Sequence, residues 1–326
     1  MLSRSYIRRY VNVKKMMRDV LSYKTGSIIV LIVVMQIMCI LFVPRYCSVV
    51  NFRVLLRAIP ELGIVAIGVC LLMIAGEFDL SIGSTLALTA LIMSLLFKNG
   101  LNIWLSFLIS LIAGSLIGAM NGLITIKARI SSFITTLGMM MVWRGVVLVL
   151  SGGHPSTFLP PLSFHAILAG HIGLIQAQFI WFVGVAIFFW LLLENHKFGN
   201  SVFASGGNKE AAAAIGVNPD RVKLICFVIT GLLAAVAGCI GVTRVTSISA
   251  LQGQGMELQA IAAVVIGGTS LRGGEGTILG AFLGATIIYT VQNILLLLRA
   301  PGFYFQLFVG VIIIIVVTLN AMIKRR

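Results

Sequence analysis

The feature that most constrains this chain is a series of apolar runs, each long enough to cross a bilayer, that repeats from residue 28 onward. The hydrocarbon core of a membrane offers no water to backbone N–H and C=O groups, so a crossing segment has to form a helix or join a closed barrel. Barrel strands alternate apolar and polar residues over about ten positions, whereas these runs are continuous. The sequence therefore predicts an all-α, polytopic integral membrane protein.

These runs predict about ten transmembrane helices. The expected segments are 28–43, 58–75, 80–97, 103–126, 133–150, 174–193, 223–243, 247–268, 277–298 and 303–323. Segment 247–268 is the poorest, because polar side chains such as Gln252, Gln254 and Glu257 stand in its first half. We nevertheless predict a full crossing there, since a re-entrant segment would place the basic C-terminal tail on the outer side. With no soluble domain between the runs, residues 1–326 form a single transmembrane domain.

The net charge of +15 fits membrane topology better than nucleic-acid binding. Most basic residues gather in segments that an inward-facing N-terminus and C-terminus would place in the cytoplasm, as the positive-inside rule describes. Residues 1–27 then form a basic cytoplasmic segment. Among the basic residues left on the outer side are Arg45, Arg53 and Arg57. The sequence thus predicts a membrane-lipid environment, cytoplasmic termini and no nucleic-acid partner.

A polar loop, residues 194–223, interrupts this otherwise apolar chain and contains a short predicted helix. Asn208 can cap its start, Glu210 is favourable in its first turn, and Gly216 can close its end. A two-turn helix at a membrane protein's surface has neither lipid nor a core to pack against. We interpret it as a cytoplasmic contact for another protein; the alternative is a solvated helix that caps the bundle.

Several kinds of chemistry are missing from the sequence. No GxxxxGK[ST] phosphate-binding loop is present, and the glycine-rich stretch 267–277 lacks the required lysine, so the chain is not expected to hydrolyse ATP. That stretch is either a hinge or a plain tight turn. The five cysteines form no CxxC or Cys/His metal spacing, and no cofactor is expected. The acidic residues fall near predicted helix ends, which disfavours coupling to an ion gradient.

Four stretches carry a resemblance to a known family. They are AGEFDLSIGSTLALTA (75–90), MNGLITIKARISSFITTLGMMMVWRG (120–145), ASGGNKEAAAAIGVNPDRVK (204–223) and GMELQAIAAVVIGGTSLRGGEGTILGAFLGA (255–285). In this order they resemble the permease subunits of bacterial ABC sugar importers of the ribose/xylose/galactose class. Glu77 departs from the pattern, because many members carry a neutral residue at that position.

The resemblance implies a non-enzymatic, multi-pass permease subunit in the bacterial inner (plasma) membrane that forms the path for a monosaccharide. Implied partners are two cytoplasmic ATPase subunits, a second permease copy or homologue, and an extracytoplasmic sugar-binding protein. The broader superfamily also transports branched-chain amino acids and nucleosides, so another small solute remains an alternative. A further alternative is an ion-coupled secondary carrier.

The candidate site residues fall into two groups. The loop 194–223 is expected to couple the permease to the ATPase through Asn208, Lys209, Glu210, Ala211, Ala212 and Gly216. The translocation path or gate is expected to include Asp79, Gln254, Glu257 and Gln259.

Several of these assignments leave two interpretations open. Asp79 is either an N-terminal helix cap or a gate residue on the inner mouth of the path. The polar residues of segment 247–268 line a hydrated route, or they belong to an outer loop with a shorter helix behind it. Arg144 snorkels toward the outer surface or pairs with an acid on a neighbouring helix. Asn121 and Asn293 are expected to form interhelical hydrogen bonds.

Overall fold

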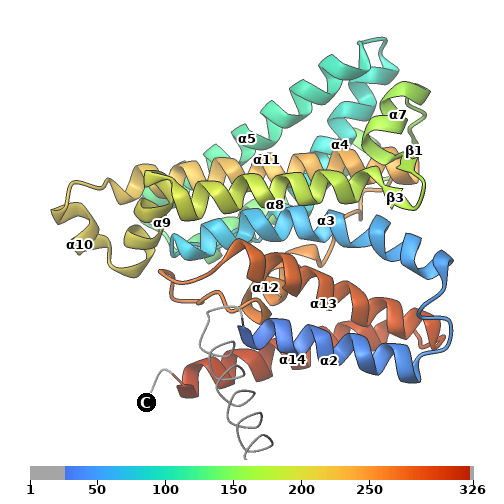
Figure 1. The fold of residues 1–326 in the computed structure, drawn as a ribbon. Helices are drawn as coiled ribbons and strands as arrows, with labels where there is room; N and C mark the ends of the chain where they lie inside the picture. Colours follow the sequence, from blue (N-terminus) through green and yellow to red (C-terminus); the bar gives the residue numbers. More distant parts are fainter. Residues whose placement is uncertain (1–25, 324–326) are drawn as a thin grey trace, which may run out of the picture.

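The computed structural model describes residues 26–323, and the expected basic segment 1–27 lies almost entirely outside them. The described chain is a bundle of helices with two small two-stranded sheets (Figure 1). Its elements are α2 (Gly26–Phe42), α3 (Val49–Ile74), α4 (Ile82–Lys98), α5 (Ile103–Ala128), α6 (Ser132–Ser151), β1 (Ser156–Thr157), α7 (Leu162–Ala169), β2 (His171–Ile172), β3 (Ile175–Gln176), α8 (Ala177–Asn195), α9 (Lys197–Gly207), α10 (Lys209–Ala214), α11 (Pro219–Val245), β4 (Ser247–Ile248), α12 (Met256–Ile266), α13 (Ile278–Leu297) and α14 (Phe303–Ile323).

The apolar runs form helices, as predicted. Among the described residues, six helices are long and apolar enough to cross a membrane: α3, α5, α6, α8, α11 and α13. The helices α2, α4, α12 and α14 are also apolar, but their apolar stretches are only 10–17 residues long. The all-α membrane fold is therefore confirmed, whereas a count of ten crossings stays a prediction.

Helices α3 and α11 form the centre of the bundle. Both are buried over most of their apolar length, whereas α6 and α8 expose most of theirs. Small residues bring the central helices together: a Cβ on Gly118 of α5 would lie 2.2 Å from the carbonyl oxygen of Phe227 on α11. Close backbone approach at small residues is how helices gain packing in lipid, where burial from water cannot drive their association.

The two ends of the bundle differ in character. Helices α9 and α10 lie at one end, and α7, β1 and β3 lie at the other (Figure 1). Strand β1 pairs antiparallel with β4, with Ser156 opposite Ile248. The start of α2 and the end of α14 both lie toward the α10 end (Figure 1). Both described chain ends thus share one side, and its assignment to the cytoplasm stays a prediction.

The continuous helix predicted over 247–268 is wrong. Only Met256–Ile266 is helical, 11 residues long, or about 16 Å, roughly half of a 30 Å hydrocarbon core. The preceding residues form β4 and a series of turns in which Gly253 has φ +71° and Gly255 has φ +80°. Left-handed backbone at two glycines cannot continue a right-handed helix. The alternative of a shorter helix behind a loop describes this segment's secondary structure better.

Replacing Gly284 by valine should destabilise the packing of α12 on α13, because a Cβ there would lie 1.9 Å from the carbonyl oxygen of Ala263. We expect a loss of about 1–3 kcal/mol in the free energy of unfolding. The measurement is the thermal unfolding of the detergent-purified chain. Gly184→Val on α8 is the matched control, because nothing lies within 4 Å of its added Cβ. Equal melting temperatures for the two variants would contradict this packing.

Candidate functional site

Two breaks in helical structure meet inside the bundle. The first comprises residues 75–81 between α3 and α4, and the second comprises residues 246–255 between α11 and α12. A Cβ on Gly83, in the first turn of α4, would lie 2.2 Å from the carbonyl oxygen of Gly253. Only a glycine at residue 83 permits this approach. The N-terminal ends of α4 and α12 therefore converge on one point, which we call the break junction.

Asp79 holds the first break in place. Its side chain is 2% exposed, and its Oδ1 accepts hydrogen bonds from the backbone N–H (2.8 Å) and hydroxyl (2.7 Å) of Ser81. Asn121 of α5 donates to Asp79 Oδ2 at 3.2 Å and to Ser81 Oγ at 2.7 Å. Asn121 stands seven residues before the end of α5, about 10 Å along the helix. The first break is thus recessed into the protein.

This geometry refines the expectation for Asp79. Ser81, not Asp79, occupies the N-cap position of α4. Asp79 instead stabilises the turn that leads into the helix, in the manner of an Asx turn. The interhelical hydrogen bond expected for Asn293 is confirmed, because it donates to Asn51 Oδ1 of α3 at 2.7 Å. Asn121 instead bonds the non-helical segment between α3 and α4.

Helix α6 supplies further hydrogen bonds to the first break. The backbone N–H of Phe78 donates to Ser132 Oγ at 3.1 Å, and that of Leu80 donates to Thr136 Oγ1 at 3.0 Å. Buried N–H groups without partners would each cost about 1–3 kcal/mol. Sequence reasoning missed these two hydroxyls. A run of Ser and Thr at the start of an apolar helix was the available signal.

Arg144 of α6 holds the second break. Its Nη1 donates to the carbonyl oxygens of Ala250 (2.6 Å) and Gln252 (2.8 Å). Arg144 and Glu257 also attract each other electrostatically. The main partners of this cation are therefore backbone carbonyls, which neither sequence interpretation included. A non-helical backbone leaves carbonyl oxygens free of helix hydrogen bonds, and a buried guanidinium can bond them.

The predicted path residues surround the second break unevenly. Glu257 is half-buried at the junction: its Oε1 accepts from the N–H of Gly255 at 3.1 Å, and its Oε2 would lie 2.6 Å from a Cβ on Gly83. Gln259 is also half-buried, whereas Gln254 is exposed. The structure brings Glu257 to the break junction and leaves Gln254 on the surface.

A second polar cluster lies beside this segment. Arg244, in the last turn of α11, forms a salt bridge of 2.9 Å with Glu61 of α3. A Cβ on Gly241 would lie 2.7 Å from Glu61 Oε1 and 3.3 Å from Gln252 Nε2, so both side chains share one space. Sequence reasoning did not pair these charges, because they stand 183 positions apart.

The short helix predicted in loop 194–223 is confirmed as α10. Asn208 Oδ1 caps it by accepting from the N–H of Ala211 at 2.9 Å. Gly216, at φ +84°, closes it. Ala212 is buried, whereas Lys209, Glu210 and Ala211 are exposed. The helix therefore rests on the protein through one residue and presents the rest of its surface outward.

The base of α10 is joined to the end of α3 through glycine backbones. A Cβ on Gly206, at the end of α9, would lie 1.7 Å from the carbonyl oxygen of Ile74. The same oxygen accepts a hydrogen bond of 2.8 Å from the N–H of Gly274. The stretch 267–277 is thus a tight turn packed on α3 and α9. We call this set of contacts the glycine base.

Two ion pairs connect the same region. Lys209 bonds Asp220 at 2.8 Å on the surface, and Lys223 bonds Glu77 at 2.5 Å where both side chains are mostly buried. The second pair ties the start of α11 to the first break. Glu77, whose role sequence reasoning left unassigned, therefore has a structural partner.

Comparison with known proteins places these features in context. Residues 51–317 match the family described as the permease component of the branched-chain amino acid transport system. The chain is 38% identical over 288 residues to the xylose/arabinose import permease of Sulfolobus acidocaldarius, covering 86% of this chain and 80% of that protein. It is 36% identical over 308 residues to the ribose import permease of Bacillus subtilis, covering 94% and 95% respectively.

A more distant relative is the autoinducer 2 import system permease of Enterobacter sp. (strain 638). It is 32% identical over 287 residues, which cover 86% of this chain and 82% of that protein. No solved structure was found to match the chain.

Replacing Asp79 by asparagine should destabilise the first break. The new amide would present N–H groups to the donating amide of Asn121, or leave a buried polar group unpaired, at a cost of about 1–3 kcal/mol. The double variant Asp79→Asn/Asn121→Asp restores one donor and one acceptor and should recover part of the loss. Thermal unfolding in detergent measures both. A double variant less stable than the sum of the single changes would contradict the bonding described.

Proposed function

The chain belongs to the permease family of the branched-chain amino acid transport system, and on that premise we propose that it forms the transmembrane path of an ABC importer for a monosaccharide. The observation that carries this proposal is the similarity to ribose and xylose/arabinose import permeases over most of the chain. That similarity extends over the first break, α10 and the second break, so it includes every part of the site described above.

A sugar is favoured over the other solutes of this superfamily. The family description mentions branched-chain amino acids, but the relatives at 34–38% identity are named for ribose or for xylose and arabinose. We propose a path lined by Glu257 and Gln259 at the break junction, with Asp79 holding the first break beside it, whereas Gln254 lies on the surface. Carboxylates accept hydrogen bonds and side-chain amides both accept and donate them, and sugar hydroxyls require both kinds of partner.

The energy for transport comes from partner subunits in this proposal. We propose two cytoplasmic ATPase subunits, a second permease copy or homologue, and an extracytoplasmic binding protein that delivers the sugar. The α10 end of the bundle faces the cytoplasm of a bacterial cell and receives the ATPase. The exposed surface of α10 supports this assignment, since Ile215 at its end is 75% exposed and available to a partner.

Movement of α10 would reach the path through the glycine base. Gly206 and Ile74 meet backbone to backbone, so a displacement of α9 cannot be absorbed by a change of side-chain rotamer. Ile74 is the last residue of α3 and directly precedes the first break. The Lys223–Glu77 pair connects α11 to the same segment. We propose that ATP-driven motion at α10 shifts the first break against the second and changes the side to which the path opens.

The direct test is reconstitution of the chain in liposomes with its ATPase and binding protein, followed by uptake of radiolabelled pentoses and hexoses. ATP-dependent uptake of a monosaccharide is the expected result. Uptake of a branched-chain amino acid or nucleoside instead would contradict the sugar assignment. Uphill transport by the chain alone on a proton or sodium gradient would contradict the ABC mechanism.

Changing the exposed surface or the end of α10 should uncouple ATP hydrolysis from transport. We expect Glu210→Arg and Gly216→Leu to leave the chain inserted while uptake falls at least tenfold. The leucine also strains a backbone with φ +84°. ATPase activity and uptake are measured on the same proteoliposomes. Glu194→Arg, an exposed charge reversal in the same loop outside α10, is the control. Normal uptake by both α10 variants would refute the coupling role.

Removing polar groups from the start of α12, next to the second break, should impair transport without impairing assembly. We expect Glu257→Leu/Gln259→Leu to lower uptake at least tenfold, because a sugar in the path loses hydrogen-bonding partners. Co-purification with the ATPase should be retained. Gln306→Leu, an exposed glutamine on α14, is the control and should transport normally. Unchanged uptake by the double variant would place the path elsewhere.

A further inference from the structure

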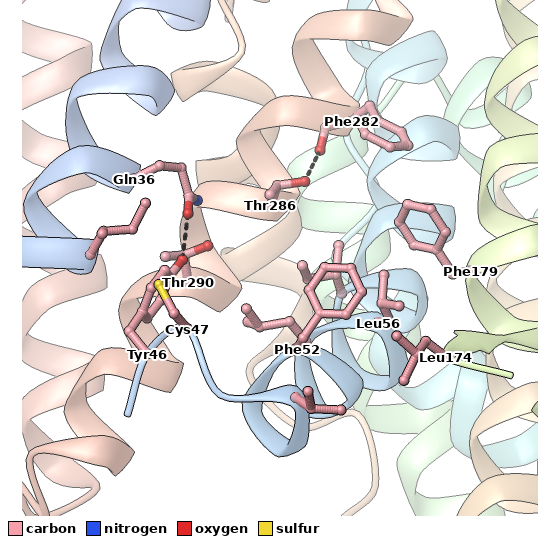
Figure 2. A pocket seen from close by; sticks show the side chains of 14 residues that line it. Gln36, Tyr46, Cys47, Phe52, Leu56, Leu174, Phe179, Phe282, Thr286 and Thr290 are labelled. Carbon is pink, nitrogen blue, oxygen red and sulfur yellow. Dashed lines mark hydrogen bonds between the residues drawn. The ribbon is translucent and has the colours of Figure 1, made fainter. Parts of the chain in front are cut away.

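An apolar groove of about 470 Å³ opens between α2, α3, α8 and α13, toward the end of the bundle opposite α10 (Figures 1 and 2). Phe52, Leu56, Phe179 and Phe282 point into it (Figure 2). Tyr46, at its rim, donates a hydrogen bond of 2.6 Å to Gln36 Oε1. The proposed sugar path does not use this groove, since none of its residues line it.

A second, separate apolar hollow of about 310 Å³ shares Phe282 with this groove, and its other lining residues, among them Trp190 and Ile278, lie nearer the α10 end of α8 and α13. From Thr290 in the first hollow to Ile278 in the second, the lining follows 12 residues of α13, a length of about 18 Å. Because Ile278 is the first residue of α13, a chain that followed both hollows from the end opposite α10 would pass the midplane, since one leaflet of the hydrocarbon core is about 15 Å thick. The two hollows together are as long as one extended fatty acyl chain.

Three exposed arginines stand close in the sequence to residues that line this groove. Arg45 directly precedes Tyr46, and Arg53 shares a face of α3 with the lining residues Val49 and Leu56, four positions before it and three after it. Arg57 follows one turn later and donates to Gln176 Oε1 at 2.8 Å. All three arginines are exposed.

None of these arginines forms a salt bridge with a carboxylate of residues 26–323. The nearest acid along α3, Glu61, is paired with Arg244. In the orientation predicted above, this cluster also lies on the side that the positive-inside rule leaves poor in basic residues. Topology therefore does not explain three arginines without a carboxylate partner beside an apolar groove.

We infer that this groove binds an anionic phospholipid from the leaflet opposite α10. One acyl chain lies along α8 and α13, and the phosphate is bound by Arg45 and Arg53, with Arg57 beside them. A guanidinium offers paired N–H donors that match phosphate oxygens. A second copy of this chain fits the surface poorly, because a two-fold contact would set the arginine cluster against itself.

The test uses the full-length chain in detergent and the fluorescence of Trp190, which lines the second hollow. Phosphatidylglycerol with brominated acyl chains is titrated in, and phosphatidylcholine with the same chains is compared. The signal assigned to Trp190 is the part lost in Trp190→Phe. We expect half-maximal quenching by phosphatidylglycerol at a concentration at least tenfold lower than by phosphatidylcholine. Added salt should weaken the former, because it screens the phosphate.

Two variants separate head-group binding from chain binding. Arg45→Gln/Arg53→Gln should weaken quenching by phosphatidylglycerol about fivefold for each arginine removed and leave phosphatidylcholine unaffected. Thr286→Phe, which fills the groove, should weaken quenching by both lipids. Lys98→Gln is the control: it removes a cation from α4, which does not line the groove. All variants are first checked for wild-type elution and melting.

Three results would overturn the inference. Equal affinity for the two lipids would mean ordinary lipid contact without head-group recognition. Unchanged preference in the arginine double variant would place the phosphate elsewhere. Absence of quenching in a chain that elutes as a dimer would mean that a second copy covers the groove.

Discussion

Backbone that leaves helical geometry inside a membrane has to find its hydrogen bonds within the protein, and the structure of this chain depends on how it meets that requirement. Its two helix breaks are bonded by side chains from neighbouring helices. Asn121, Ser132 and Thr136 serve the first break, and Arg144 serves the second. The bonds of Ser132, Thr136 and Arg144 satisfy backbone groups, and those of Asn121 hold the side chains of Asp79 and Ser81. Short helices such as α12 can therefore begin in the interior, and two helix N-terminal ends can converge on one point.

The same requirement explains why glycines stand where the breaks meet. At Gly83 and at Gly206, an added Cβ would collide with a carbonyl oxygen of another segment. Contacts between backbones are stiff, since no rotamer can change to relieve a shift. A bundle with one such contact at the break junction and another at the base of α10 can transmit movement between its surface and its interior.

Helix α10 and the breaks differ in how far local sequence could predict them. Asn208 and Gly216 predicted α10 correctly, because capping depends on residues within three or four positions of each other. Segment 247–268 was predicted as one helix from its hydropathy and from the charge of the C-terminal tail. That prediction failed because Gly253 and Gly255 adopt left-handed conformations. Arg144 helps to hold this segment by bonding the carbonyl oxygen of Ala250, which stands 106 positions later in the chain.

The sequence by itself determined the membrane environment, the all-α class, the cap of α10 and the family. Hydropathy, short-range capping and ordered motifs are all properties of local residues. Only the tertiary structure decided the partners of Arg144, Glu77 and Glu61, the depth of Asp79, and the meeting of Gly83 with Gly253. Each of these depends on which helices lie side by side. Helix packing in lipid is set by shape and by long-range hydrogen bonds, and the residue pattern along a single helix predicts neither.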